Sequence, residues 1–167
     1  KTEYYLGGSA AIARHLSSFV NKVNILSPFG FESYYKKIIK KNFSKNIKTN
    51  FFKPHNNYQT ITKTRFVDEI SGYKLFGSYV LPEKSEVNFE KIVKKTIEKK
   101  KKEIDMFIIC DYGHNFISKV IANEIKKTKK HISLNAQVNA ANIGYHSINN
   151  YIGIDSLIIN ENELRQE

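Results

Sequence analysis

The segment at residues 107–118, FIICDYGHNFIS, constrains the fold more than any other part of the chain. Its apolar residues run without interruption to Cys110 and stop at Asp111. A short continuous apolar run suits a strand that is buried on both faces of a parallel sheet. The apolar residues that follow are spaced as in a helix (Phe116, Ile117, Val120, Ile121 and Ile125). Asp111 is therefore expected at the carboxyl end of a central strand, where open α/β sheets bind their ligands.

Asp111 also has a purely structural interpretation, which the sequence leaves open. An aspartate after a strand often shapes the turn or caps the helix that follows. Cys110, the single cysteine of the chain, lies inside the same apolar run. It is expected in the core and not as a nucleophile, since a reactive thiolate needs an exposed, electropositive setting. A single cysteine also excludes a disulfide within the chain, which favours a cytoplasmic protein.

The charge of the chain raises the question of a nucleic-acid partner. Its 167 residues carry a formal net charge of +11 at pH 7, and basic proteins often bind nucleic acids or anionic surfaces. The lysines, however, are scattered over several expected helices, where they are typical of solvent-facing sides. We therefore expect no nucleic acid among the partners. A nucleic-acid-binding module would need a contiguous basic face with exposed aromatic side chains.

Several other classes of protein are disfavoured by the motifs that the sequence lacks. There is no apolar run of about 18 residues, the length needed to cross a bilayer. The opening KTEYYLGGSAA has no apolar stretch of the kind found in secretory signals. The sequence contains no Walker A loop, no GxGxxG fingerprint and no GxSxG elbow, and its histidines show no metal-binding spacing. We expect a cytoplasmic protein with no membrane partner.

Apolar periodicity divides the chain into alternating strands and helices. Such alternation is typical of a parallel sheet covered by helices, with right-handed crossovers. A chain of this length usually forms one domain, so the sequence predicts a single α/β domain over residues 1–167. Strands are expected at residues 23–26, 47–53, 107–110, 131–134 and 155–159, and helices at residues 9–20, 34–41, 88–103 and after 116.

A β-hairpin is expected at residues 58–81. Residues 58–67 and 73–81 read as extended segments, and the sequence DEISG between them supplies a turn. Both faces of this hairpin carry polar residues, so it is not expected within the main sheet. A separate lid over a binding site suits the pattern, and an ordinary edge hairpin is the alternative.

Polar residues follow two of the expected strands. Asp111 ends one of them, and Asn160 and Glu163 follow the last. Because parallel strands end at the same edge of a sheet, these three residues are expected in one cleft. Carboxylate and amide oxygens are ligands that hydrated Mg²⁺ prefers. Lys63 and Arg65 on the hairpin would add positive charge for a phosphate group.

Four short motifs, taken in order, resemble those of the ribokinase-like (PfkB) carbohydrate kinases. GGSAAIAR, which begins at Gly7 and Gly8, resembles the sugar-binding GG opening of that family, and TKTR at residues 62–65 resembles its T-x-K-x-R segment at the entry to the lid. DYG at residues 111–113 resembles the DYGKG loop of the heptose-phosphate kinases, and NENE at residues 160–163 fits the NxxE motif. Tyr151 precedes NxxE at the spacing of that branch. The resemblance runs through nearly the whole chain.

The resemblance implies a ribokinase-like three-layer sandwich with a mostly parallel sheet and an inserted lid hairpin at residues 58–81, incomplete at both ends. It implies an ATP- and Mg²⁺-dependent kinase that phosphorylates a hydroxyl of a sugar or sugar phosphate, as in ADP-heptose synthesis for surface polysaccharides. The lid would also join two copies in a homodimer. Gly7, Gly8, Lys63, Arg65 and Asp111 would bind the substrate, and Asn160 and Glu163 would organise phosphate and Mg²⁺, Glu163 acting through water.

The sequence also departs from the family pattern. Ala11 stands where the GG motif usually has asparagine, and His114 and Asn115 replace the Lys-Gly of DYGKG. The loop at residues 135–150 is longer than the corresponding segment of the family. The family's opening strand, with its sugar-binding Asp, and its GAGD-type segment, with the catalytic base, have no counterpart in these residues. We therefore expect no catalytic residue of that type here and no sugar phosphorylation by this chain alone.

Two alternatives to the kinase stay open. One is a non-catalytic ribokinase-like domain that binds a sugar nucleotide or a partner protein, which the change at Ala11 and the altered DYGHN loop favour. The other is a basic nucleic-acid-binding module, for which scattered lysines are unfavourable evidence. The sequence does not identify the sugar or the oligomeric state.

Overall fold

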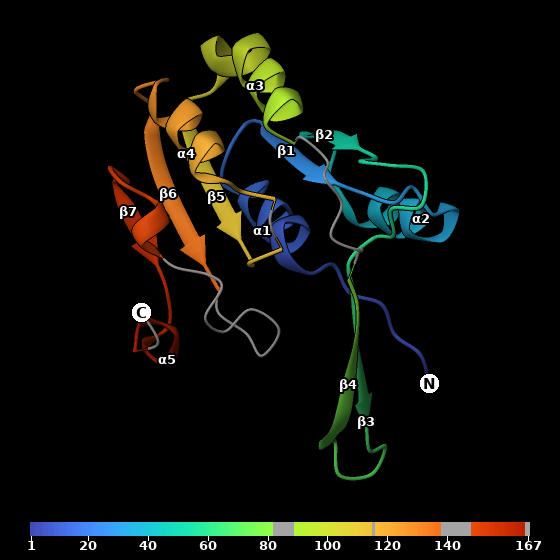
Figure 1. Ribbon diagram of the computed structural model, residues 1–167. Coiled ribbons are helices and arrows are strands. Elements are labelled where there is room, and N and C mark those ends of the chain that lie inside the picture. Colours follow the sequence, from blue (N-terminus) through green and yellow to red (C-terminus); the bar gives the residue numbers. More distant parts are fainter. Residues whose placement is uncertain (82–88, 115, 138–147, 166–167) are drawn as a thin grey trace. The chain divides into compact units, whose positions relative to one another are not determined.

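The computed structural model describes residues 1–81, 89–114, 116–137 and 148–165, in two compact units, Lys1–Val87 and Asn88–Glu167. Each unit combines helices with a parallel sheet (Figure 1). The expected mixed α/β class with mostly parallel sheets is therefore confirmed. The ribokinase-like three-layer arrangement stays a prediction. Within the described ranges, no helix is long and apolar enough to cross a membrane.

The first unit is built on a parallel pair of strands, in which Val23 lies opposite Ile47. Helix α1 packs on this pair, because its buried Ala13 joins Ile25 and Ile47 in one apolar cluster. Phe43 and Phe51 extend the cluster at its margin. The elements of the first unit are α1 (Gly8–Leu16), β1 (Val23–Pro28), α2 (Ser33–Asn42), β2 (Ile47–Phe52), β3 (Thr62–Val67) and β4 (Lys74–Val80).

The second unit contains a three-stranded parallel sheet in the order β5-β6-β7. Its middle strand β6 is the most deeply buried, and Leu134 has no exposed surface. The elements of the second unit are α3 (Phe89–Lys100), the 3₁₀ turn η1 (Lys101–Glu103), β5 (Met106–Asp111), α4 (Lys119–Lys126), β6 (His131–Ala136), the 3₁₀ turn η2 (Ile148–Asn150), β7 (Ser156–Ile158) and α5 (Glu161–Leu164).

Helices α3 and α4 of the second unit lie side by side (Figure 1). The ring of Phe89 meets Phe116 edge to face, with the centroids 5.5 Å apart. Ser118 caps α4 by accepting a hydrogen bond from the Ile121 N–H at 3.2 Å, and its hydroxyl donates to Glu90 on α3 at 2.8 Å. These contacts hold α4, the helix that follows β5, against α3.

The hairpin is present as expected, with β3 and β4 paired only with each other in antiparallel register. Every residue of β4 is exposed, which agrees with the expectation that the hairpin lies outside the main sheet. At its base, Thr60 donates hydrogen bonds to both carboxylate oxygens of Glu32, through its N–H at 2.8 Å and through its hydroxyl. The Gly30 N–H in turn donates to the Thr60 hydroxyl at 2.9 Å. This small network ties the hairpin to the segment before α2.

The structure corrects three details of the sequence-based expectations. Strand β5 forms one edge of its three-stranded sheet, and β6 takes the central place that was expected for β5. The helix after β5 begins at Lys119, because Ser118 supplies the cap. Helix α1 spans Gly8–Leu16 and not residues 9–20, with Gly7 as its N-cap. Three parts of the sequence-based expectations lie outside the described residues. They are the start of α3 at residue 88, the residue Asn115, and most of the loop at residues 135–150.

Candidate functional site

The carboxylate of Asp111 is the most deeply buried acidic side chain at the end of a strand, with 6% of its surface exposed. The Tyr151 hydroxyl donates a hydrogen bond to its Oδ2, and the Gly113 N–H donates to its Oδ1 at 2.9 Å. Its backbone carbonyl accepts from the Gln137 N–H at 2.9 Å. The structural interpretation of Asp111 is therefore confirmed for the turn, where Gly113 adopts a φ of 69°. The helix cap, by contrast, is Ser118.

Tyr151 is the buried partner of Asp111 and comes from the segment just after η2. Burial, together with the adjacent Asp111 carboxylate, raises the pKa of Tyr151 far above its usual range. The phenol therefore stays neutral at ordinary pH and remains a hydrogen-bond donor. The pair places a fixed acceptor at the carboxyl end of β5.

The neighbours of Asp111 are also shielded from water. Burial lowers the pKa of His114, and the negative charge of Asp111 partly opposes this effect. Burial raises the pKa of Tyr112 to about 12 and the pKa of Cys110 to about 11. Cys110 is thus a protonated thiol at neutral pH, which agrees with the expected core role. His114 is favoured as a neutral imidazole, and so it differs in charge from the lysine that the resemblance would place there.

Asn160 and Glu163 form a reciprocal capping box at the start of α5. Asn160 Oδ1 accepts a hydrogen bond from the Glu163 N–H at 2.9 Å, and Glu163 Oε2 accepts from the Asn160 N–H at 3.2 Å. Glu163 has only 7% of its surface exposed. The spacing that suggested an NxxE motif therefore has a local structural role as well, because this arrangement satisfies two backbone donors of a helix start.

Asp111 and the capping box of Asn160 and Glu163 lie at the same end of one sheet, where its strands finish. Strands β5, β6 and β7 are parallel, so Asp111 and the segment that begins at Asn160 both follow carboxyl ends. Strand β6 separates them, since Asp111 pairs with Ala136 and Ile158 pairs with Asn135. Two strand spacings amount to about 10 Å across the sheet. A small ligand can span this distance, although Asp111 and Asn160 do not contact each other.

The described residues contain no preformed cluster of metal ligands. None of their His, Cys, Asp and Glu side chains form a group of three that could bind a metal ion directly. In Glu163, Oε2 is used in the capping box, and Oε1 forms no hydrogen bond within the described part of the chain. Mg²⁺ retains several water molecules in most protein sites. The water-mediated role of Glu163 stays a prediction.

The remaining expected site residues belong to the first unit. Gly7 is exposed and precedes α1, and Gly8 has a φ of 52°, in the left-handed region that favours glycine. Lys63 and Arg65 are exposed on β3, two residues apart and on one face of the hairpin. Their proximity to Asp111, which lies in the other unit, stays a prediction.

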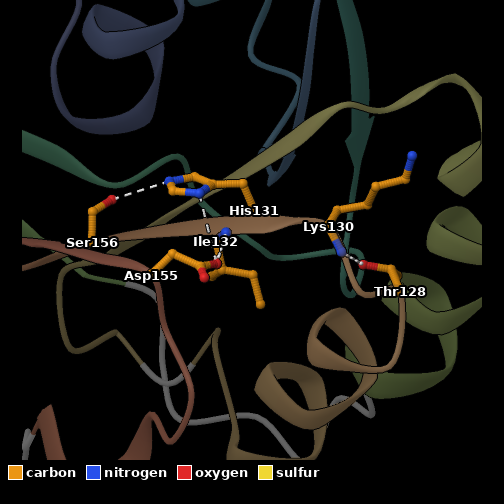
Figure 2. Close-up of polar contacts among 6 residues, drawn as sticks. All are labelled: Thr128, Lys130, His131, Ile132, Asp155 and Ser156. Atoms are coloured by element: carbon orange, nitrogen blue, oxygen red, sulfur yellow. Dashed lines mark hydrogen bonds and ion pairs between the residues drawn. The ribbon is translucent and has the colours of Figure 1, made fainter.

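A second polar cluster lies at the opposite edge of the β5-β6-β7 sheet, where β6 and β7 begin (Figure 2). Asp155 Oδ2 accepts from the Ile132 N–H at 2.8 Å and lies 3.8 Å from His131 Nδ1, while Ser156 Oγ lies 3.5 Å from His131 Nε2. A nucleophile and its base lie about 2.6–3.2 Å apart in catalytic triads. The Asp155 N–H also donates to the Ile132 carbonyl at 2.9 Å. The cluster therefore helps to fix the register of the two strands, and its distances are longer than those of a formed triad.

Sequence reasoning missed two contacts around the candidate residues, Tyr151 with Asp111 and Glu32 with Thr60. Tyr151 had been noted only for its spacing from Asn160, which carries no information about its partner.

The chain matches no family model, no curated protein and no solved structure. The function must therefore be inferred from the residues and their geometry.

Proposed function

We propose that this chain is part of a ribokinase-like, ATP-dependent kinase that phosphorylates a hydroxyl of a sugar or sugar phosphate. The observation that carries the proposal is the buried carboxylate of Asp111 at the carboxyl edge of a parallel sheet. Ligands of open α/β sheets bind at that edge. The capping box of Asn160 and Glu163 follows β7 on the same edge, which supports a shared site.

Each residue would act by positioning or by its charge, which is how enzymes accelerate phosphoryl transfer. Asp111 would accept a hydrogen bond from a sugar hydroxyl and thereby orient it. Gly7 and Gly8 would let the backbone approach the sugar, because neither carries a side chain. Lys63 and Arg65 would neutralise phosphate from the lid. Bound ATP with Mg²⁺ would supply the phosphoryl group.

A homodimer through the hairpin belongs to the same proposal. One face of the hairpin carries Phe66 and Phe76, which stack with centroids 4.2 Å apart, and Val80. All three side chains are exposed. An isolated two-stranded hairpin is only marginally stable in water, so covering this apolar face with a second copy would stabilise it. A substitution of Phe76 by Thr should then convert a dimer into a monomer, as measured by light scattering.

A non-catalytic ribokinase-like domain that binds a sugar nucleotide or a partner protein is the second candidate. It is favoured by the capping box itself, because Asn160 and Glu163 satisfy each other's backbone groups without any ligand. Because the capping box is complete without a ligand, the presence of the Asn160 and Glu163 side chains is explained without ATP or Mg²⁺. Substitutions at Asn160 that preserve the cap separate the two candidates, as described in the Discussion.

Calorimetric titration of the chain with heptose and hexose phosphates tests the shared part of the proposal. We expect Asp111→Asn to weaken sugar-phosphate binding at least tenfold, because the hydroxyl loses a charged acceptor. Asp105→Asn is the matched control, since Asp105 is an exposed carboxylate just before the same strand. Equal binding by Asp111→Asn and the wild type would contradict a sugar site at this edge.

A coupled assay of ADP release tests the expectation that this chain alone does not phosphorylate sugars. We expect no turnover with the same sugar phosphates, because no catalytic base is assigned within these residues. Turnover that depends on the added sugar would overturn that expectation. It would then direct the search for the base to the surroundings of Asp111 and His114.

A further inference from the structure

The face of the hairpin opposite the stacked phenylalanines collects positive charge. In the antiparallel register Lys63 lies opposite Tyr79, and Arg65 lies opposite Gly77. Directly opposed residues, and residues two apart on one strand, project from the same face of a sheet. Lys63, Arg65 and Tyr79 therefore share one face, which we call the cationic face.

Lys74 brings a third charge to the cationic face. A register shift near Val67 displaces it from simple alternation. A Cβ placed on Gly77 would lie 3.5 Å from Cε and 3.7 Å from Nζ of Lys74, so the lysine side chain occupies the space above this glycine. Because Gly77 faces the same side as Arg65, the ammonium of Lys74 belongs to the cationic face.

Tyr79 lies at the centre of these charges. The Nζ of Lys63 is 4.7 Å from the centroid of its ring. The hydrogen bond from Lys63, together with the charges of Lys63, Lys74 and Arg65, lowers the pKa of Tyr79. Within the described part of the chain, none of the three cations forms an ion pair with a carboxylate. The cationic face is thus a concentrated positive surface, with no carboxylate paired to it among the residues that the structure describes.

An exposed aromatic ring accompanies the charges. Tyr79 lies on the cationic face and is 39% exposed. Cations beside an exposed ring on an extended surface are a pattern that binds single strands, because phosphates meet the cations and a base stacks on the ring.

We propose that the cationic face, which includes the ring of Tyr79, binds single-stranded nucleic acid. This goes beyond the proposed kinase function and reverses the expectation drawn from scattered lysines, because folding brings Lys63, Arg65 and Lys74 together. An acidic peptide would satisfy the charges but offers no bases to stack on the ring. A duplex keeps its bases stacked inside and so leaves Tyr79 unused.

Fluorescence anisotropy with a labelled 15-nucleotide oligo(dT) tests the proposal. The triple variant Lys63→Gln, Arg65→Gln and Lys74→Gln should weaken binding at least tenfold. In single strands each phosphate contact contributes about −0.7 to the slope of log K against log salt. The variant should therefore reduce the magnitude of that slope by about 2. Tyr79→Ala should weaken binding several-fold without changing the slope.

A matched variant controls for net charge. Lys37, Lys40 and Lys41 are exposed on α2 of the same unit, and their replacement by Gln removes the same formal charge. This control should retain near wild-type affinity. Equal losses in the two triple variants would overturn the proposal, because binding would then depend on total charge alone. Equal affinity for an abasic oligomer, a duplex or polyglutamate would also overturn it, since none of these offers free bases to the ring.

Discussion

The hydroxyl of Tyr151 donates a hydrogen bond to the carboxylate of Asp111, and both side chains are buried. Forty positions separate the two residues in the sequence. Asp111 ends β5 and Tyr151 precedes β7, so the bond connects segments that flank β6 in the sheet. It fixes the orientation of the carboxylate at the edge where a ligand is proposed to bind.

Replacement of Tyr151 by Phe removes this donor and keeps the ring. The buried carboxylate of Asp111 then loses one hydrogen bond, and an unsatisfied buried group costs about 1–3 kcal/mol. We expect a loss of that size in the free energy of unfolding, measured by urea denaturation followed by circular dichroism. Tyr73→Phe is the control, because it removes a hydroxyl from an exposed ring. A loss below about 0.5 kcal/mol would mean that the bond is weak or that water replaces it.

His114 should make the stability of the protein depend on pH in the acidic range. Burial lowers its pKa in the folded state below the usual 6.5. The unfolded chain therefore binds a proton more readily than the folded chain as the pH falls through 6.5. Stability from this group is complete above that pH and is lost as the pH falls through the folded-state pKa. His114→Gln should flatten the acidic part of a curve of unfolding free energy against pH, and an unchanged curve would show that His114 is accessible to protons.

The position of Asp111 at a strand end could be predicted because the apolar run before it is short and continuous, which favours a strand. The edge position of β5 in its sheet was not predictable from this run. Asn160 and Glu163 were recognised from a spacing of three residues, but the same spacing encodes a capping box, so sequence alone does not separate the two roles. The partnership of Tyr151 and Asp111 was not predictable. It depends on the path of the chain after β6, which no local periodicity specifies. The position of Lys63 and Lys74 on one face likewise depends on a register shift in the hairpin.

Gly7 and Gly8 should respond differently to substitution by alanine. Gly8 has a positive φ, and an L-residue in that region costs about 1–2 kcal/mol. A Cβ on Gly7 would meet no atom within 4 Å. Gly8→Ala should therefore lower the thermal midpoint more than Gly7→Ala, whose smaller effect comes from alanine being a poorer N-cap than glycine. If Gly7→Ala still weakens sugar-phosphate binding in calorimetry, the loss must come from the ligand's approach to the backbone, whereas unchanged binding would place the sugar elsewhere.

Ionisation of the Cys110 thiol should lower the free energy of unfolding in alkaline solution. Burial raises the pKa of its thiol from 9.0 to about 11 in the folded state. Because the unfolded chain releases the proton first, the stability from this group is complete below pH 9 and is lost as the pH rises towards 11. Cys110→Ala should make this alkaline decline less steep, whatever its effect at neutral pH. The native thiol should also react slowly with iodoacetamide at pH 8 and rapidly in urea, and fast native labelling would contradict its burial.

Asn160 allows the kinase and the non-catalytic domain to be distinguished, because its cap and its proposed ligand role need different groups. Serine is as good an N-cap as asparagine, whereas alanine costs about 0.5–2 kcal/mol. Asn160→Ser should therefore retain the stability of the wild type, and Asn160→Ala should lose it. If the carboxamide organises phosphate, Asn160→Ser should still weaken ATP binding in calorimetry with Mg²⁺ present. A stable Asn160→Ser variant with unchanged ATP affinity would leave the capping box as the only role of this motif and would favour the non-catalytic domain.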